Sequence, residues 1–193
     1  HYCGLRCGNV CLQRFTLDEN AILQAARIAL AAGMGTVVLQ SGEWPDANAH
    51  AIARIVSKLK ALGDISVTLS LGDHEVDSYA LWRDAGADRY LLKIETFDES
   101  LHAKLRPGQS MRERLQRLET LHRLGFETGS GIISGLPGMS DTMLANDLLR
   151  LAELPLDMIA IGPFIAHPDT PLSSCTNGSM PEALRAMAIM RLL

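Results

Sequence analysis

The feature that most constrains the fold of this chain is a regular alternation of helical and strand patterns. Each helical pattern ends at a glycine or near a proline, and a short apolar run follows it. Runs of this kind are typical of strands that are buried on both faces of a parallel sheet. Their alternation with helices predicts an α/β fold. The expected strands are residues 36–40, 65–69, 89–93, 127–133 and 158–161.

The expected helices lie between these strands and at both ends of the series. The first has the sequence of a capping box, with Thr16 as the N-cap and Glu19 three residues further on. No linker or low-complexity tract divides the series, so residues 1–193 are predicted to form one domain. The other expected helices are residues 49–62, 76–85, 112–124 and 141–153, and a last helix that begins at Pro181.

Two architectures compete for this pattern, a barrel and an open doubly wound sheet. The G-x-G-x-x-G fingerprint of dinucleotide-binding open sheets is absent from the sequence. Polar residues or glycines follow every expected strand, as in barrel enzymes, which build their sites at the carboxyl ends of the strands. A complete barrel needs about 250 residues. The prediction is therefore a partial TIM-type (β/α) barrel with five visible βα units, truncated at both ends.

Charge and hydropathy argue against two classes of partner. The net charge is −4 and like charges form no block, which argues against a nucleic-acid partner. No apolar run approaches the ~20 residues of a membrane-spanning helix, and no signal-peptide pattern opens the sequence. The expected setting is the cytoplasm, with no membrane partner. In that setting a cysteine cluster favours metal binding or catalysis over disulfides.

Three of the four cysteines, Cys3, Cys7 and Cys11, lie in the first eleven residues. A structural zinc site would normally show a second pair of ligands, and no such pair is obvious in this chain. An iron–sulfur cluster takes thiolates as its ligands, and three thiolates would leave one iron open to a substrate or cofactor. Cysteines without a metal are the third alternative, and the residues alone leave all three open.

A series of motifs resembles the radical S-adenosylmethionine (SAM) enzymes. The first, residues 2–6 (YCGLR), resembles the end of the C-x3-C-x2-C loop that holds the cluster in that family. The resemblance is strongest to the HydE-type maturases of FeFe-hydrogenase, which are relatives of biotin synthase. The motifs cover nearly the whole chain and continue through residues 38–43, 68–72, 86–92, 95–96, 102–107, 135–138, 161–165 and 167–171.

The resemblance implies one metal ligand in this chain. Cys3 would be the last of three thiolate ligands of a 4Fe-4S cluster, with the first two at positions before His1. Cys7 and Cys11 fall where the family pattern requires no cysteine.

The resemblance also implies contacts to SAM, the second cofactor. The segment Ser41, Gly42 and Glu43 would meet the methionine amino group. Glu95 would contact the ribose or methionine part, and Arg114 would reach the methionine carboxylate, which suits the fork geometry of arginine.

Substrate contacts follow from the same resemblance. Gln40, Ser70 and Lys93 would face the substrate, and Lys93 stands where the maturase pattern has arginine, which leaves the substrate's identity open. The segment from Gly131 to Gly135 resembles a strand motif that leads toward the adenine. The alternative for these glycines is close strand packing.

The function that the resemblance implies is that of a radical SAM enzyme in hydrogenase H-cluster assembly. The cluster would cleave SAM reductively to a 5′-deoxyadenosyl radical, which would act on a small, amino-acid-derived, sulfur-containing iron complex. No side chain need act as acid or base, so no catalytic residue is named, and the expected partners are this small molecule and maturation proteins. One alternative is a biotin synthase-like or methylornithine synthase-like radical enzyme. Another is a non-catalytic metal-binding module that uses Cys3, Cys7 and Cys11.

Overall fold

The computed structural model describes residues 1–44 and 47–193 of the chain. These residues divide into two compact units, and each is described by itself. The Gly-Glu unit, named after Gly42 and Glu43, comprises Arg14–Leu92 and Arg117–Thr128. The cysteine-loop unit comprises His1–Gln13, Lys93–Gln116 and Gly129–Leu193.

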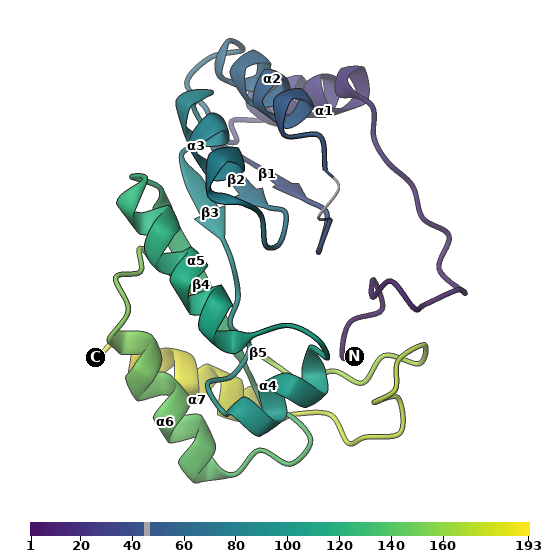
Figure 1. Ribbon diagram of the computed structural model, residues 1–193, viewed down its shortest axis with the longest axis vertical. Helices are drawn as coiled ribbons and strands as arrows, with labels where there is room; N and C mark the ends of the chain where they lie inside the picture. The colour runs from purple at the N-terminus through teal and green to yellow at the C-terminus, as the bar shows by residue number, and fades with distance from the viewer. Residues whose placement is uncertain (45–46) are drawn as a thin grey trace. The chain divides into compact units, whose positions relative to one another are not determined.

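The Gly-Glu unit is built on three parallel strands that lie in chain order. A helix precedes each strand, because parallel neighbours need a long crossover connection. The helices pack together beside the strands (Figure 1). The elements of this unit are α1 (Glu19–Ala31), β1 (Thr36–Gln40), α2 (Ala49–Lys60), β2 (Ser66–Ser70), α3 (Val76–Asp84) and β3 (Arg89–Leu91).

Strands β1 and β2 differ in burial although their sequences are alike. The three central residues of β2 are buried, as expected for an inner parallel strand. In β1, by contrast, exposed and half-buried residues alternate, and Val38 is 54% exposed. The prediction that this first strand is buried on both faces is therefore wrong for the described structure. The physical reason is that β1 is an edge strand, which pairs within the described residues with β2 alone.

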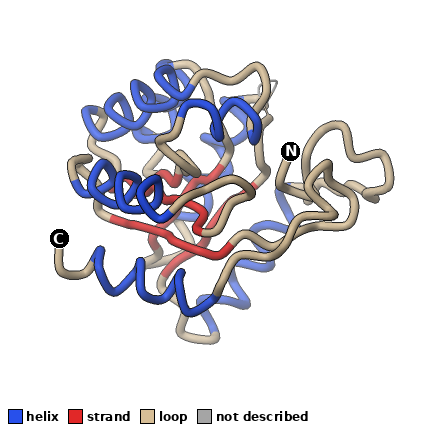
Figure 2. Tube along the Cα trace, turned by 90° about the horizontal axis from the view of Figure 1, so that it is seen from below, coloured by secondary structure: helices blue, strands red, loops and turns tan. Residues whose placement is uncertain are grey.

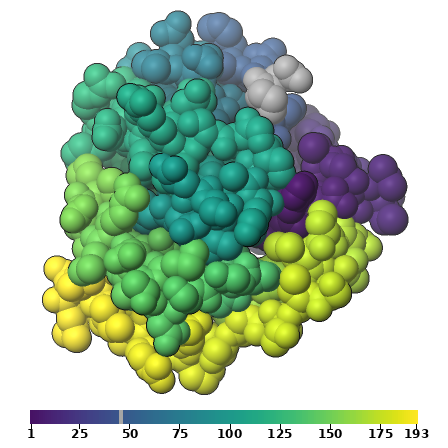
Figure 3. Space-filling model, turned by 60° about the horizontal axis from the view of Figure 1, so that its bottom comes forward, coloured from purple at the N-terminus to yellow at the C-terminus, as the bar shows by residue number. Residues whose placement is uncertain are grey.

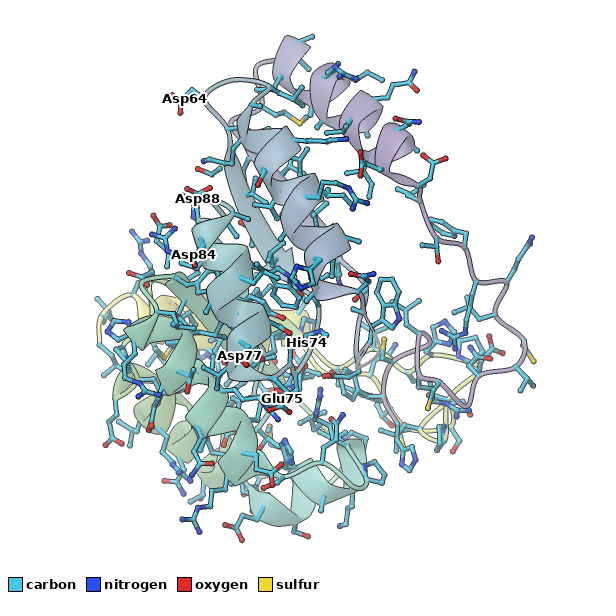
Figure 4. The ribbon with its side chains drawn as sticks, turned by 45° about the horizontal axis from the view of Figure 1, so that its top comes forward. Asp64, His74, Glu75, Asp77, Asp84 and Asp88 are labelled. Carbon is cyan, nitrogen blue, oxygen red and sulfur yellow. The ribbon has the colours of Figure 1, made fainter. Side chains whose placement is uncertain are left out.

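An aromatic cluster fills the space between α3 and β3. Tyr79 and Trp82 of α3 and Tyr90 of β3 are fully buried. Trp82 stacks on Tyr90 with ring centroids 6.2 Å apart, and His74 meets Trp82 edge-on at 4.9 Å. Figure 4 shows His74 and Glu75 at the start of α3.

The cysteine-loop unit contains the last two strands, which are also parallel. Their register runs from Gly129 opposite Met158 to Ser134 opposite Pro163. The ends of two elements, residues 117–123 and 127–128, belong to the Gly-Glu unit. The elements are α4 (Glu99–Leu105), α5 (Met111–Arg123), β4 (Glu127–Ser134), α6 (Asp141–Ala152), β5 (Met158–Pro163) and α7 (Met180–Met190).

The glycine at the buried centre of β4, Gly131, has a packing role. It lies opposite Ala160 of β5, and a Cβ at this position would collide with the carbonyl oxygen of Ala160. Close strand packing therefore requires glycine here.

The cap of α1 and the presence of helix α4 both differ from what the sequence predicts. The N-cap of α1 is Asp18, whose carboxylate accepts from the N–H of Ala21 at 2.8 Å, so the predicted cap at Thr16 is wrong. An aspartate two residues nearer the helix satisfies the free N–H groups directly. Helix α4 was not expected, although Asp98 caps it in the same way by accepting from Leu101.

The start of the chain is a loop rather than a helix or strand, as the tan tube near N in Figure 2 shows. It lies beside the segment that follows β5 (purple beside yellow-green in Figure 3). Arg6 donates to the carbonyl of Asp169 at 3.3 Å, and a Cβ at Gly4 would collide with the ring of His167. The segment after β5 therefore helps to position the loop at the start of the chain, which carries Cys3, Cys7 and Cys11 and is called the cysteine loop below.

No helix in the described part of the chain is both long enough and apolar enough to cross a membrane.

Candidate functional site

The ends of β1 and β2 bring three of the expected site residues together in the Gly-Glu unit. Gln40 and Ser70 are the last residues of their strands and lie opposite each other in the register. The N–H of Ser41 donates to the carbonyl of Ser70 at 3.2 Å, which continues the pairing one residue beyond β1. Gln40 and Ser41 are exposed and Ser70 is half-buried. These side chains therefore share one strand end, as the sequence predicts.

Glu43 ties the turn after β1 to the turn after β2. Its side chain is exposed, and one carboxylate oxygen accepts from the N–H of Asp73 at 2.9 Å. Gly42 and Gly72 have φ angles of 81° and 86°, a region that favours glycine. A Cβ at Gly72 would also collide with the Glu43 carboxylate. The close approach of these two turns therefore positions Glu43.

The second group of candidate residues lies in the cysteine-loop unit and begins with Cys3. Its thiol is half-buried and free, and the N–H of Leu5 donates to its sulfur at 3.4 Å. Cys7 and Cys11 are exposed. No group of three or more His, Cys, Asp or Glu side chains among the described residues could hold a metal ion. The alternative site made of all three cysteines is therefore not formed in the described structure.

Glu95 follows β3 with an unusual backbone. Among the described residues it is the only non-glycine residue with positive φ, at 70°. Its N–H donates to the carbonyl of Gly131 at 3.0 Å, and its carbonyl accepts from Ile133 at 2.9 Å. A residue in this conformation costs about 1–3 kcal/mol and persists where its surroundings fix it, often at functional sites. Here β4 is the surrounding structure that fixes it.

The side chain of Glu95 is buried and contacts Tyr2 and Lys93. Only 4% of Glu95 is exposed. The hydroxyl of Tyr2 donates to Oε1 at 2.6 Å, and the ammonium of Lys93 lies 3.3 Å from Oε2. Burial, followed by the charge of Glu95, raises the pKa of Tyr2 well above its usual value, so Tyr2 remains a donor.

Arg114 is buried in the same unit rather than solvated on the helix surface. It is 5% exposed, and its Nε donates to the carbonyl of Lys93 at 2.6 Å. The loop after β3 is therefore contacted from two sides, by the cysteine loop through Tyr2 and by α5 through Arg114. The structure brings Lys93, Glu95 and Arg114 close together in this unit.

Comparison with protein-family models identifies the family of this chain. The family model of the radical SAM superfamily matches residues 1–151. The chain belongs to the radical SAM superfamily. Enzymes of this superfamily use a 4Fe-4S cluster and SAM. The prediction of the family is therefore confirmed.

Individual relatives narrow the resemblance. The chain is 47% identical over 192 residues to the [FeFe] hydrogenase maturase subunit HydE of Thermotoga maritima, with 100% of this chain and 55% of that protein covered. It is 25% identical to 3-methylornithine synthase of Methanosarcina acetivorans, again over 100% of this chain and 55% of the relative. The chain thus spans about half the length of these relatives.

Solved structures confirm the predicted fold class. The crystal structure of methylornithine synthase (PylB) superimposes with a TM-score of 0.90 at 25% identity, over 99% of this chain and 57% of that one. The maturase HydG from Carboxydothermus hydrogenoformans gives 0.81 at 17% identity, over 99% and 48%, and shows the fold alone. The predicted class, parallel strands that alternate with helices as in barrel-type radical SAM enzymes, is therefore confirmed.

The residues of the cysteine-loop unit fit the cofactors of the superfamily. Cys3 offers a free thiol, and a backbone N–H bonded to sulfur is one of the contacts that tune thiolate-held clusters. Glu95 offers a buried carboxylate oxygen, Oε2, with no hydrogen-bond partner in the described part of the chain. Such an orphaned oxygen suits a ligand that supplies the missing donor.

One residue of this site, Tyr2, was not singled out from the sequence. The signal that could have found it is the aromatic ring directly before Cys3, in a loop otherwise rich in glycine and polar residues. Nothing in the sequence indicates that its hydroxyl reaches Glu95, 93 positions later.

Proposed function

We propose that the protein containing this chain is a radical SAM enzyme of [FeFe]-hydrogenase maturation. The 47% identity to HydE over the whole chain supports this assignment. The observation in the structure that carries it is the buried Oε2 of Glu95, which has no hydrogen-bond partner among the described residues and lies beside the loop of Cys3.

The proposed roles follow from the chemistry of each side chain. Cys3 is a thiolate ligand of the 4Fe-4S cluster. Glu95 accepts hydrogen bonds from the ribose hydroxyls or the methionine ammonium of SAM, because a carboxylate is an acceptor. Arg114 holds the methionine carboxylate with its planar fork. Ser41, Gly42 and Glu43 bind the methionine ammonium.

The proposed substrate contacts are Gln40, Ser70 and Lys93. The bound cofactors supply the reaction's chemistry, reductive cleavage of SAM to methionine and a 5′-deoxyadenosyl radical. The protein's own residues bind and orient SAM and keep water from the reacting atoms. The substrate is a small molecule, and the protein's partners are other maturation proteins. A reducing, cytoplasmic setting suits the four free thiols.

The assignment is tested with the full-length protein, reconstituted with iron and sulfide without oxygen. We expect the broad visible absorption of an iron–sulfur cluster and release of 5′-deoxyadenosine from SAM when a reductant is added. Cys3→Ser should abolish both, whereas the matched variants Cys7→Ser and Cys11→Ser should retain them. Loss of the cluster in the Cys7 or Cys11 variant would instead favour the three-cysteine site.

A methylornithine synthase-like activity is the second candidate. It is supported by the superposition on methylornithine synthase, with a TM-score of 0.90. The two are separated by expression in a host that lacks its own HydE maturase. Restored hydrogenase activity supports the first candidate, and its absence with retained SAM cleavage supports the second.

A further inference from the structure

The loop of Cys3 and the carboxylate of Glu95 are joined directly by Tyr2. Its hydroxyl donates to Oε1 of Glu95 at 2.6 Å. Hydrogen bonds to an ionised acceptor are shorter and about twice as strong as neutral ones.

The ring of Tyr2 is itself fixed by packing. It lies against a buried apolar cluster made of Leu105, Ile133, Leu136 and Phe164. These residues come from α4, the end of β4 and the segments after β4 and β5. The position of the hydroxyl is therefore set by the core of the unit and not by a free side-chain rotation.

The two carboxylate oxygens of Glu95 differ in their hydrogen bonding. Oε1 is used by Tyr2, whereas Oε2 has no hydrogen-bond partner within the described residues. Lys93 approaches Oε2 to 3.3 Å but is not aligned to donate to it. A buried acceptor without a partner is costly, about 1–3 kcal/mol, so its retention points to a ligand.

We propose that Tyr2 is a positioning residue that holds Glu95 with Oε2 turned toward SAM, so that SAM affinity depends on the loop carrying Cys3. This inference rests on the proposed SAM contact of Glu95. Tyr2 precedes Cys3, so the loop that holds the cluster ligand also orients the carboxylate. The left-handed backbone of Glu95 is fixed by hydrogen bonds with Gly131 and Ile133, and among the described residues Tyr2 is the hydrogen-bond donor to its carboxylate.

The test compares variants of the cluster-loaded, full-length protein. Tyr2→Phe keeps the ring and removes the hydroxyl. We expect the Kd for SAM, measured by equilibrium dialysis without reductant, to rise about tenfold. The KM for SAM should rise in parallel, while kcat and the visible absorption of the cluster stay within about twofold. Tyr79→Phe, which removes a buried hydroxyl far along the sequence in the Gly-Glu unit, is the matched control and should leave the Kd unchanged.

A double-variant cycle separates positioning from a structural role. In a Glu95→Ala background, Tyr2→Phe should weaken SAM binding no further, because Tyr2 acts through Glu95. An unchanged Kd in Tyr2→Phe, a full additional effect in the Glu95→Ala background, or loss of the cluster absorption would each overturn the proposal. Wild-type protein that takes up no cluster or binds no SAM would reject the proposed function as well. Wild-type protein that binds SAM, with a Tyr2→Phe variant that binds it equally well, would reject only this inference.

Discussion

Glu43 and Glu95 each lie in a loop that follows a strand, and their surroundings are opposite. Glu43, after β1, is exposed and accepts one backbone N–H, from Asp73 at 2.9 Å. Glu95, after β3, is 4% exposed and has a φ of 70°. The first carboxylate is solvated and inexpensive to keep. The second carries the cost of burial, of a left-handed backbone and of an oxygen that lacks a hydrogen bond within the described residues. This is the pattern expected where function outweighs stability.

We expect the largest loss of stability when Gly131, which holds the backbone of Glu95, is substituted. Gly131 accepts the N–H of Glu95 through its carbonyl, and its missing Cβ lets β5 approach. We expect Gly131→Ala to lower the free energy of unfolding by about 3 kcal/mol, because a methyl group would collide with the backbone of β5. Urea denaturation checks this. Gly162→Ala, in β5 with no atom near its Cβ position, should cost less than about 1 kcal/mol. Equal losses in both variants would mean that strand propensity, and not the close approach, sets the cost.

Removing the charge of Glu95 should separate function from stability. Glu95→Gln retains an acceptor for Tyr2 but removes the buried carboxylate. We expect SAM affinity to fall about 100-fold while the free energy of unfolding stays the same or rises. Dialysis with SAM and urea denaturation of the same preparation measure the two quantities. A fall in stability of more than about 2 kcal/mol with unchanged SAM affinity would show that Glu95 is structural.

Substitutions in the turns around Glu43 should lower the free energy of unfolding less than Gly131→Ala does. Gly72→Ala meets both a positive φ and the Glu43 carboxylate, so we expect a loss of about 2 kcal/mol in the free energy of unfolding. Gly42→Ala has a similar φ but open space around its Cβ, and should cost about 1 kcal/mol. Thermal denaturation of the pair gives the difference. Two equal values would argue that the contact with Glu43 adds nothing.

The smallest expected effect concerns acid stability of the Gly-Glu unit. His74 is buried among aromatic rings, and burial lowers its pKa below that of the unfolded chain. As pH falls below about 6.5, the unfolded chain therefore takes up the proton first, and the folded state loses stability until the folded pKa is passed. Unfolding free energies at pH 7.5 and pH 5.5 should differ less in His74→Gln than in the wild-type protein. Identical pH dependence in the two proteins would exclude His74 as the source.

Much of the fold could be predicted because its signals are local. Apolar runs preceded by glycine or proline placed all five strands, and the same residues mark the ends of the helices between them. The burial of β1 could not be predicted, because its sequence resembles that of β2 and only the pairing of the strands makes it an edge. Helix α4 was missed although Asp98 is a normal cap, because its seven residues are too short for a periodic pattern.

Part of the candidate site could also be predicted from the sequence, and part could not. Residues at strand ends, such as Gln40 and Ser70, could be placed from the sequence because parallel strands end at one edge. Their roles came from family resemblance and remain predictions, as does the single domain. Tyr2 could not be connected to Glu95, because that contact joins a loop and a strand end far apart in the sequence.

The sequence by itself determined the class of the fold, the family and the residue types at the site, because periodicity and motifs are local properties of the chain. Only the tertiary structure decided which groups meet. It buried Glu95 and Arg114, left the Glu43 side chain exposed, and joined the Tyr2 hydroxyl to Oε1, whereas Oε2 has no hydrogen-bond partner in the part of the chain that the structure describes. These outcomes depend on desolvation and on distances across the fold, which no local pattern contains.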